Sequence, residues 1–280
     1  MFLNSAKRHI IVKLFILCSV GLIVCRASAQ QSYLGFDRNQ YPGDQNLKVL
    51  RQTFAYTGFW LNNPPGENTN SWQGKRQAIE SAGFGFMVLF NGRLDKQLRH
   101  NAAALGKTDA QAAVTSAQHE GFPARTVIFL DIEEGGRMLP EQKAYIYAWV
   151  DAVNSSGFRA GVYCSGIPAR EDKNTTVVTA DDIRNNAQGR PIVYWVTNDV
   201  CPPSPGCAFP SQAPPPAESN IDFADVWQFA QSPRRPDFAA KCHNYNRDGS
   251  CYPPGVDPST HLFVDVNTAT SADPSGAAAH

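Results

Sequence analysis

Residues 126–136 read TVIFLDIEEGG, and this stretch decides the fold class that we expect. Val127 to Leu130 form a continuous apolar run, which is typical of a short strand buried on both faces of a parallel sheet. The run ends at Asp131 and Glu133. Because side chains alternate along a strand, these acids are expected to share a face, about 6.5 Å apart. Neighbouring carboxyl groups can hold different protonation states, as acid and base catalysis on one bond requires. The alternative to a catalytic pair, if this stretch is considered alone, is a strand end with solvated acids and a glycine turn.

Seven further apolar runs alternate with helical patterns through most of the chain. Strands are expected at 33–37, 54–61, 86–90, 159–163, 191–196, 225–230 and 262–266, and helices at 46–52, 71–82, 108–119, 140–156 and 179–186. This alternation predicts an α/β fold, a (β/α)8 barrel of the TIM type in a single domain. In such barrels functional side chains lie at the carboxyl ends of the strands. The sequence places these polar residues at or near such ends: Asp37, Asp131, Glu133, Asn198 and Asp265.

The first 29 residues are expected to be a secretory signal peptide. Basic residues precede an apolar stretch at 14–25, and Ala-Ser-Ala at 27–29 supplies a cleavage site. Acylation of Cys25, as in a lipoprotein, is the weaker alternative, because a valine precedes it where a small residue is wanted. The expected barrel domain then spans 30–270, followed by a flexible tail at 271–280.

The charge balance limits the partners of the chain. The sequence has 25 basic and 25 acidic residues, and the leader holds basic residues but no acids. The mature chain is therefore slightly acidic, which argues against nucleic acid as a partner. No run after the leader is long enough to span a bilayer, so we expect no stable membrane insertion after cleavage. We expect a secreted monomer, extracellular or periplasmic.

Two long irregular segments late in the chain, 199–220 and 232–260, are expected to be loops over the functional face, each stapled by a disulfide. Export makes disulfides plausible, and local pairing is the simplest assignment: Cys201 with Cys207 and Cys242 with Cys251. Four cysteines nevertheless allow three connectivities.

Cys164 remains outside this scheme. It follows the apolar sequence AGVY, so a buried free thiol is expected rather than a nucleophile.

Six short motifs, in their order and spacing over most of the mature chain, resemble the family 25 glycoside hydrolases, the muramidases that cut peptidoglycan. They resemble more closely a related group of secreted domains described as glycoside-hydrolase-like. The motifs are GFDRNQ at 35–40, FLDIEEG at 129–135, GVYCSG at 161–166, VYWVTN at 193–198, VWQFAQ at 226–231 and FVDVN at 263–267.

The resemblance implies catalytic roles for four acids. Glu133 would be the general acid, with Asp37, Asp131 and Asp265 around it to orient the sugar and tune its proton. Physical reasoning agrees, because like charges in a cleft disfavour ionisation of a carboxyl group, which can then protonate a glycosidic oxygen.

The resemblance also implies residues that bind the polysaccharide. Aromatic subsites would be Tyr163, Trp195 and Trp227, although barrel core is as good an interpretation of Trp227. The polar residues expected to contact substrate are Asn91, Asn198 and Gln228. Neither a metal nor another cofactor is expected.

Three departures keep a second function open. At the end of the third strand the muramidases tend to carry an aromatic residue and a histidine, but this sequence reads FMVLFNGR. Glu134 adds a further acid to the central motif. The two long loops could narrow or close the cleft. The alternative is a non-catalytic glycan-binding module of the cell envelope. A Gly-x-Ser-x-Gly elbow and a His-Glu-x-x-His motif are both absent from the sequence.

Overall fold

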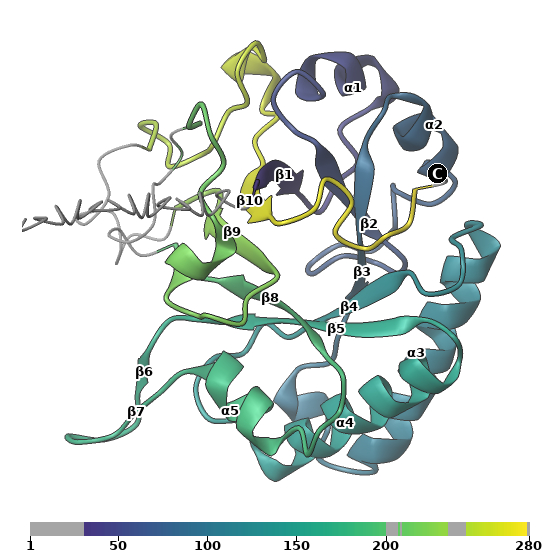
Figure 1. The fold of residues 1–280 in the computed structure, drawn as a ribbon, viewed down its shortest axis with the longest axis vertical. Coiled ribbons are helices and arrows are strands. Elements are labelled where there is room, and N and C mark those ends of the chain that lie inside the picture. The colour runs from purple at the N-terminus through teal and green to yellow at the C-terminus, as the bar shows by residue number, and fades with distance from the viewer. Residues whose placement is uncertain (1–30, 200–206, 208, 235–244, 279–280) are drawn as a thin grey trace, which may run out of the picture.

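The computed structural model describes residues 31–199, 207, 209–234 and 245–278 (Figure 1). The expected signal peptide at 1–29 lies outside these residues, as do Cys201 and Cys242. Within the described part, no helix is both long enough and apolar enough to cross a membrane.

Eight strands close into one barrel, which confirms the predicted α/β barrel in a single domain (Figure 1). Their order around the barrel is β1-β10-β9-β8-β5-β4-β3-β2. The strands are β1 (Tyr33–Asp37), β2 (Tyr56–Trp60), β3 (Gly85–Asn91), β4 (Val127–Asp131), β5 (Arg159–Ser165), β8 (Val193–Thr197), β9 (Val226–Ala230) and β10 (Asp265–Ala269). A separate small sheet pairs β6 (Ala169–Arg170) with β7 (Thr176–Val177).

Helices connect the first strands and lie outside the barrel (Figure 1). The α-helices are α1 (Asp44–Leu50), α2 (Arg76–Ser81), α3 (Ala102–His119), α4 (Pro140–Ser155) and α5 (Thr179–Asn186). Three short 3-10 helices are η1 (Asp95–Gln97), η2 (Pro216–Ser219) and η3 (Pro258–Thr260). After β8 the described residues contain 3-10 turns but no α-helix, so the regular alternation of strand and helix ends there.

The closest helix packing depends on Gly106 in α3. A Cβ atom at this position would lie 2.3 Å from the backbone oxygen of Tyr145 in α4. Glycine therefore lets the two helix backbones approach each other.

The last strand departs from the eightfold pattern, because β10 runs antiparallel to both of its neighbours, β1 and β9. The expected strand at 262–266 also begins three residues later than predicted, at Asp265. Since β10 is reversed, its first residue lies at the same barrel end as the carboxyl ends of the other strands. Asp265 is paired there with Asp37, the last residue of β1.

The segment expected to be a flexible tail, 271–280, packs against the barrel over its described residues, 271–278. Residues 271–278 run beside β2 and β3 toward α2 (Figure 1). The pairing of β3 with β4 begins only at Val88 and Ile128. The C-terminal segment lies where the earlier residues of these two strands are not paired with each other. Ser275 accepts hydrogen bonds from the backbone N–H groups of Val88 through Oγ (2.8 Å) and of Val127 through its carbonyl (2.8 Å).

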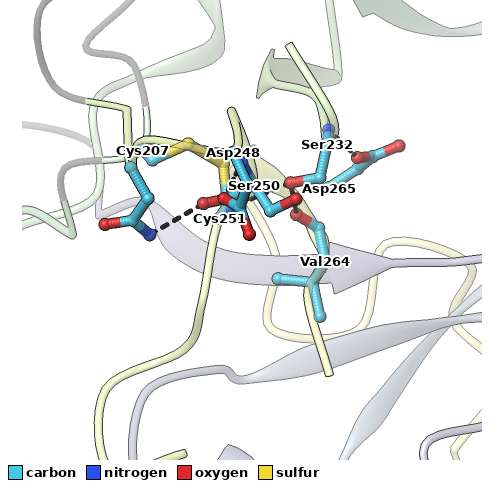
Figure 2. Close-up of a disulfide and its surroundings, with 8 residues drawn as sticks. Cys207, Ser232, Asp248, Ser250, Cys251, Val264 and Asp265 are labelled. Carbon is cyan, nitrogen blue, oxygen red and sulfur yellow. Dashed lines mark hydrogen bonds between the residues drawn. A yellow bond between two sulfur atoms is a disulfide. The ribbon is translucent and has the colours of Figure 1, made fainter. Parts of the chain in front are cut away.

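The expected local disulfides are wrong for two cysteines, because Cys207 is bonded to Cys251 across 44 residues (Figure 2). Contacts with distant residues hold Cys251: its N–H donates to Ser232 Oγ (2.6 Å) and its carbonyl accepts from Val264 (3.0 Å). Tertiary placement beside β10, rather than nearness in sequence, therefore selects the partner. Cys164 is a buried free cysteine, as predicted, and burial raises the pKa of its thiol to about 12.

Candidate active site

Four acids from three separate parts of the chain meet at the mouth of the barrel. Asp37 ends β1, Asp131 ends β4 and Asp265 begins β10. Glu133 lies beyond the end of β4, so an exposed irregular segment, and not a shared strand face, places it there. Its negative charge is one cause of the raised pKa values of the three aspartates, which shows that the carboxyl groups lie within electrostatic range of one another.

Asp37 is buried, with 5% of its surface exposed, and two amides hold its carboxyl group. Its Oδ1 accepts hydrogen bonds from Asn267 Nδ2 (2.6 Å) and Gln228 Nε2 (3.0 Å). Burial raises the pKa of Asp37 to about 6, although both hydrogen bonds oppose the rise, and the charge of Glu133 adds to it. This carboxyl group therefore changes protonation close to neutral pH.

The surroundings of Asp131 stabilise a charged carboxylate less than those of Asp37, and 3% of its surface is exposed. Apart from the carboxyl group of Glu133, no donor among the described residues reaches either of its oxygens. Burial, followed by the charges of Glu133 and Asp37, raises the pKa of Asp131 well above its ordinary value. Asp131 is thus a buried acid whose surroundings favour its protonated form, and it interacts with the exposed Glu133.

Asp265 is partly buried, and its Oδ1 accepts a hydrogen bond from the backbone N–H of Ser232 (2.6 Å; Figure 2). Burial is the largest cause that raises the pKa of Asp265, and the charge of Asp37 is the next. Raised pKa values are therefore shared by the three aspartates of the cluster, and Glu133 is its exposed member.

Tyr163 and Trp195 line the barrel interior next to these acids. The Tyr163 hydroxyl donates to Gln228 Oε1 (2.7 Å), and the Trp195 indole N–H donates to Asn267 Oδ1 (2.9 Å). The ring centroids of Tyr163 and Trp195 are 4.2 Å apart, and both side chains are buried. These two rings form the floor of the site. The side-chain amides of Gln228 and Asn267 connect them to Asp37.

Sequence reasoning did not single out two residues of this network, Asn267 and Gln231. Gln231 Nε2 donates to the Tyr163 hydroxyl (3.1 Å) and to Gln228 Oε1 (2.9 Å). The available signal for Asn267 is its spacing, because it lies two residues after Asp265 and therefore on the same strand face.

Three of the predicted substrate contacts have other partners. Trp227 is fully buried on the outer face of β9, opposite to Gln228, and its indole N–H donates to the Asn198 carbonyl (3.0 Å). The Asn198 side chain donates to the Ser219 carbonyl (2.8 Å) and so holds η2. Asn91 is paired with Asp131 in the sheet, but its amide donates to the Asn63 carbonyl (2.9 Å).

Glu134, the additional acid of the central motif, belongs to the scaffold. Its carboxylate accepts from the backbone N–H of Asp95 (2.9 Å to Oε2) and from Gln142 Nε2 (2.7 Å). It therefore ties η1 to the start of α4. The described residues contain no group of three or more His, Cys, Asp or Glu side chains that could hold a metal ion.

Comparison with known proteins gives one family match. A model for the Rv2525c-like, glycoside hydrolase-like domain matches residues 54–203, which is more than half of the chain. No curated protein matches the chain.

Solved structures share the fold over most of the chain. An uncharacterized B. stearothermophilus protein is 21% identical, with 84% of this chain and 95% of that protein covered and a TM-score of 0.54. The Mycobacterium tuberculosis Tat-secreted protein Rv2525c is 14% identical, with coverages of 85% and 95% and a TM-score of 0.51. The Clostridium perfringens spore cortex lytic enzyme SleM is 14% identical, with coverages of 86% and 68% and a TM-score of 0.50. At these identities the likeness shows the fold alone.

Proposed function

The chain belongs to the Rv2525c-like, glycoside hydrolase-like domain family, and from this premise we propose that it is a secreted glycoside hydrolase. The substrate class that we propose is cell-wall glycan, either peptidoglycan or a related N-acetylhexosamine polymer. The muramidase-like motifs support this class, and a spore cortex lytic enzyme with the same fold is consistent with it.

One observation carries the proposal: an exposed carboxyl group, that of Glu133, interacts with buried carboxyl groups whose pKa values are raised. Hydrolysis of a glycosidic bond needs an acid that protonates the leaving oxygen while the bond from this oxygen to the sugar carbon breaks. It also needs a carboxylate that stabilises positive charge on the sugar or takes a proton from the attacking water.

In the proposed mechanism, Glu133 protonates the leaving oxygen, because it is the acid of the cluster that is exposed to a bound glycan. The carboxyl group of Asp131, which is hydrogen-bonded to that of Glu133, helps to hold this acid in place. Asp37, with a pKa of about 6, supplies a carboxylate at neutral pH, and Asn267 and Gln228 fix its orientation. Tyr163 and Trp195 close the floor of the site.

The substitution Glu133→Gln tests this assignment. The amide keeps the shape of the side chain but cannot donate the proton, so the rate should fall by a factor of about 10² to 10⁴. The rate is measured as new reducing ends released from peptidoglycan and from soluble N-acetylhexosamine oligomers.

Glu134→Gln is the matched control, because it makes the same chemical change one residue away in a side chain that belongs to the scaffold. It should retain near wild-type turnover. Equal losses in both variants would contradict the role of Glu133. If wild type binds these glycans without releasing reducing ends, and Glu133→Gln binds equally well, the chain is a glycan-binding module instead.

We also propose that the chain is exported and cleaved after Ala29. The charged and apolar leader supports this, as does the Cys207–Cys251 disulfide, because structural disulfides persist in oxidising compartments. The Tat-secreted Rv2525c has the same fold. Mass spectrometry of protein recovered outside the cytoplasm should find Gln30 at the N-terminus, and a chain that retains Met1 would contradict cleavage.

A further inference from the structure

A pocket with a volume of about 390 Å³ adjoins the acid cluster at Asp265, and we call it the Arg38 pocket. Residues 38–40 after β1, residues 232–233 after β9 and residues 261–265 leading into β10 line most of it. These three strands are neighbours in the barrel. The volume lies in the range of pockets for small ligands, roughly 300 to 1,000 Å³. A glycan bound at the acids therefore has room for a substituent on this side.

Arg38 supplies the positive charge of the pocket. Its guanidinium carbon lies 6.0 Å from the centre of the Phe263 ring, which supports the group from one side. Among the described residues, the Arg38 side chain forms no hydrogen bond and no ion pair; its backbone carbonyl accepts from the Trp60 indole (3.1 Å). The guanidinium donors, arranged in a rigid planar fork, are therefore available to a ligand.

The acids of the pocket are hydrogen-bonded to groups other than the guanidinium, and Asp265 acts on Arg38 only through its charge. Glu67 Oε1 accepts from Gln40 Nε2 (3.3 Å), and Asp265 Oδ1 accepts from the Ser232 N–H (2.6 Å; Figure 2). The exposed His261 adds imidazole nitrogens to the same pocket. This combination of donors and an aromatic wall favours an anionic, planar group.

We propose that the Arg38 pocket binds a carboxylate carried by the substrate glycan, and that the protein therefore selects acidic glycans over neutral ones. A carboxylate matches the guanidinium fork with two parallel, charge-assisted hydrogen bonds. The inference rests on the proposed function, because the carboxylate must belong to a glycan that lies at the acid cluster. Two sources carry this chemistry, the lactyl group of a muramic acid and the ring carboxylate of a uronic acid.

Calorimetric titration tests the pocket with tetrasaccharides of equal length, in the Glu133→Gln variant so that no turnover interferes. The probes are an alternating N-acetylglucosamine and N-acetylmuramic acid oligomer with free lactyl carboxylates, its methyl ester, and an alternating N-acetylglucosamine and glucuronic acid oligomer. At least one acidic probe should bind about tenfold or more tightly than the ester, as expected for hydrogen bonds to a charged group. The tighter of the two acids identifies the source of the carboxylate.

Adding Arg38→Gln should remove the difference between acid and ester and leave binding of the ester unchanged. The matched control is Arg184→Gln, which removes the same charge from an arginine that also lies over a phenylalanine ring, 4.1 Å from the centre of Phe223, but on α5 and outside the pocket. It should preserve the preference for the acid. Equal binding of acid and ester, or equal weakening of both by Arg38→Gln, would overturn the proposal.

The outcomes separate this inference from the proposed function. Release of reducing ends by wild type without a preference for acidic probes overturns the role of the Arg38 pocket alone. A preference that depends on Arg38, without release of reducing ends, supports the pocket and contradicts the hydrolase. Failure to bind any of the glycans overturns both.

Discussion

Asp37 and Asp131 show how one residue type acquires two chemistries at the same barrel mouth. Both are buried, and burial is the largest cause of the raised pKa of each. Asp37 has two amide donors that stabilise its charged form, and its pKa stays near 6. Asp131 lacks such donors, and burial with the charges of Glu133 and Asp37 raises its pKa well above the ordinary value. Hydrogen-bond donors therefore distinguish the two acids, because they stabilise the charged form of Asp37, while the surroundings of Asp131 favour its protonated form.

The two tryptophans of the predicted subsites show what the sequence could and could not establish at this scale. The motifs around Trp195 and Trp227 both point to the barrel, but a motif does not give the face of a strand. Trp227 and Gln228 are neighbours on β9, so only one of them can face the interior. Gln228 is hydrogen-bonded to Asp37, and Trp227 therefore lies on the outer face. The period of two in a strand was available in the sequence to make this choice.

Among the elements, strand positions were predictable where a strand is a continuous apolar run, and the last strand shows the limit. Residues 262–264 are apolar and suggest the beginning of a strand, but β10 begins at Asp265 and carries Asp265 and Asn267 toward the interior. Polar residues replace apolar ones on its inner face because that face forms part of the site. The antiparallel direction of β10 depends on a connection longer than 30 residues after β9, whose path local patterns do not encode.

The C-terminal segment is expected to stabilise the end of the barrel opposite to the acids. Ser275 is fully buried, and its Oγ is the acceptor for the buried N–H of Val88. Ser275→Ala removes this acceptor and should lower the free energy of unfolding by about 1 to 3 kcal/mol, the cost of a buried donor without a partner. Urea unfolding, followed by tryptophan fluorescence, measures the change.

Ser271→Ala is the control for this segment, because Ser271 is exposed and its Oγ accepts only from the nearby N–H of Asp273 (3.1 Å). It should change the free energy of unfolding by less than about 0.5 kcal/mol. Indistinguishable urea midpoints for Ser275→Ala and Ser271→Ala would show that the segment does not support the barrel in solution.

At the scale of the whole molecule, the acid cluster makes the folded state sensitive to pH. The pKa of Asp37 rises from 3.8 to about 6 on folding, and those of Asp131 and Asp265 rise as well. Between the unfolded and folded pKa values the folded state binds more protons than the unfolded state, so stability decreases as pH increases. The stabilising contribution of Asp37 is complete below about pH 4 and is lost as the pH rises through about 6.

Asp37→Asn should therefore become more stable relative to wild type as the pH rises from 4 to 8. Its amide oxygen can accept the same two hydrogen bonds from Asn267 and Gln228, while no charge has to be buried. The rise of the Asp37 pKa from 3.8 to about 6 corresponds to a change on the order of 3 kcal/mol in the stability difference between the variant and wild type. Urea unfolding at a series of pH values measures this difference. The control is Asp222→Asn, at an exposed aspartate, for which the stability difference from wild type should not change with pH. Parallel curves for wild type and Asp37→Asn would contradict the raised pKa. Asp37→Asn should also be tested for cleavage of glycan. If it is more stable than wild type but inactive, burial of Asp37 lowers stability at neutral pH and in exchange provides the carboxylate that catalysis needs.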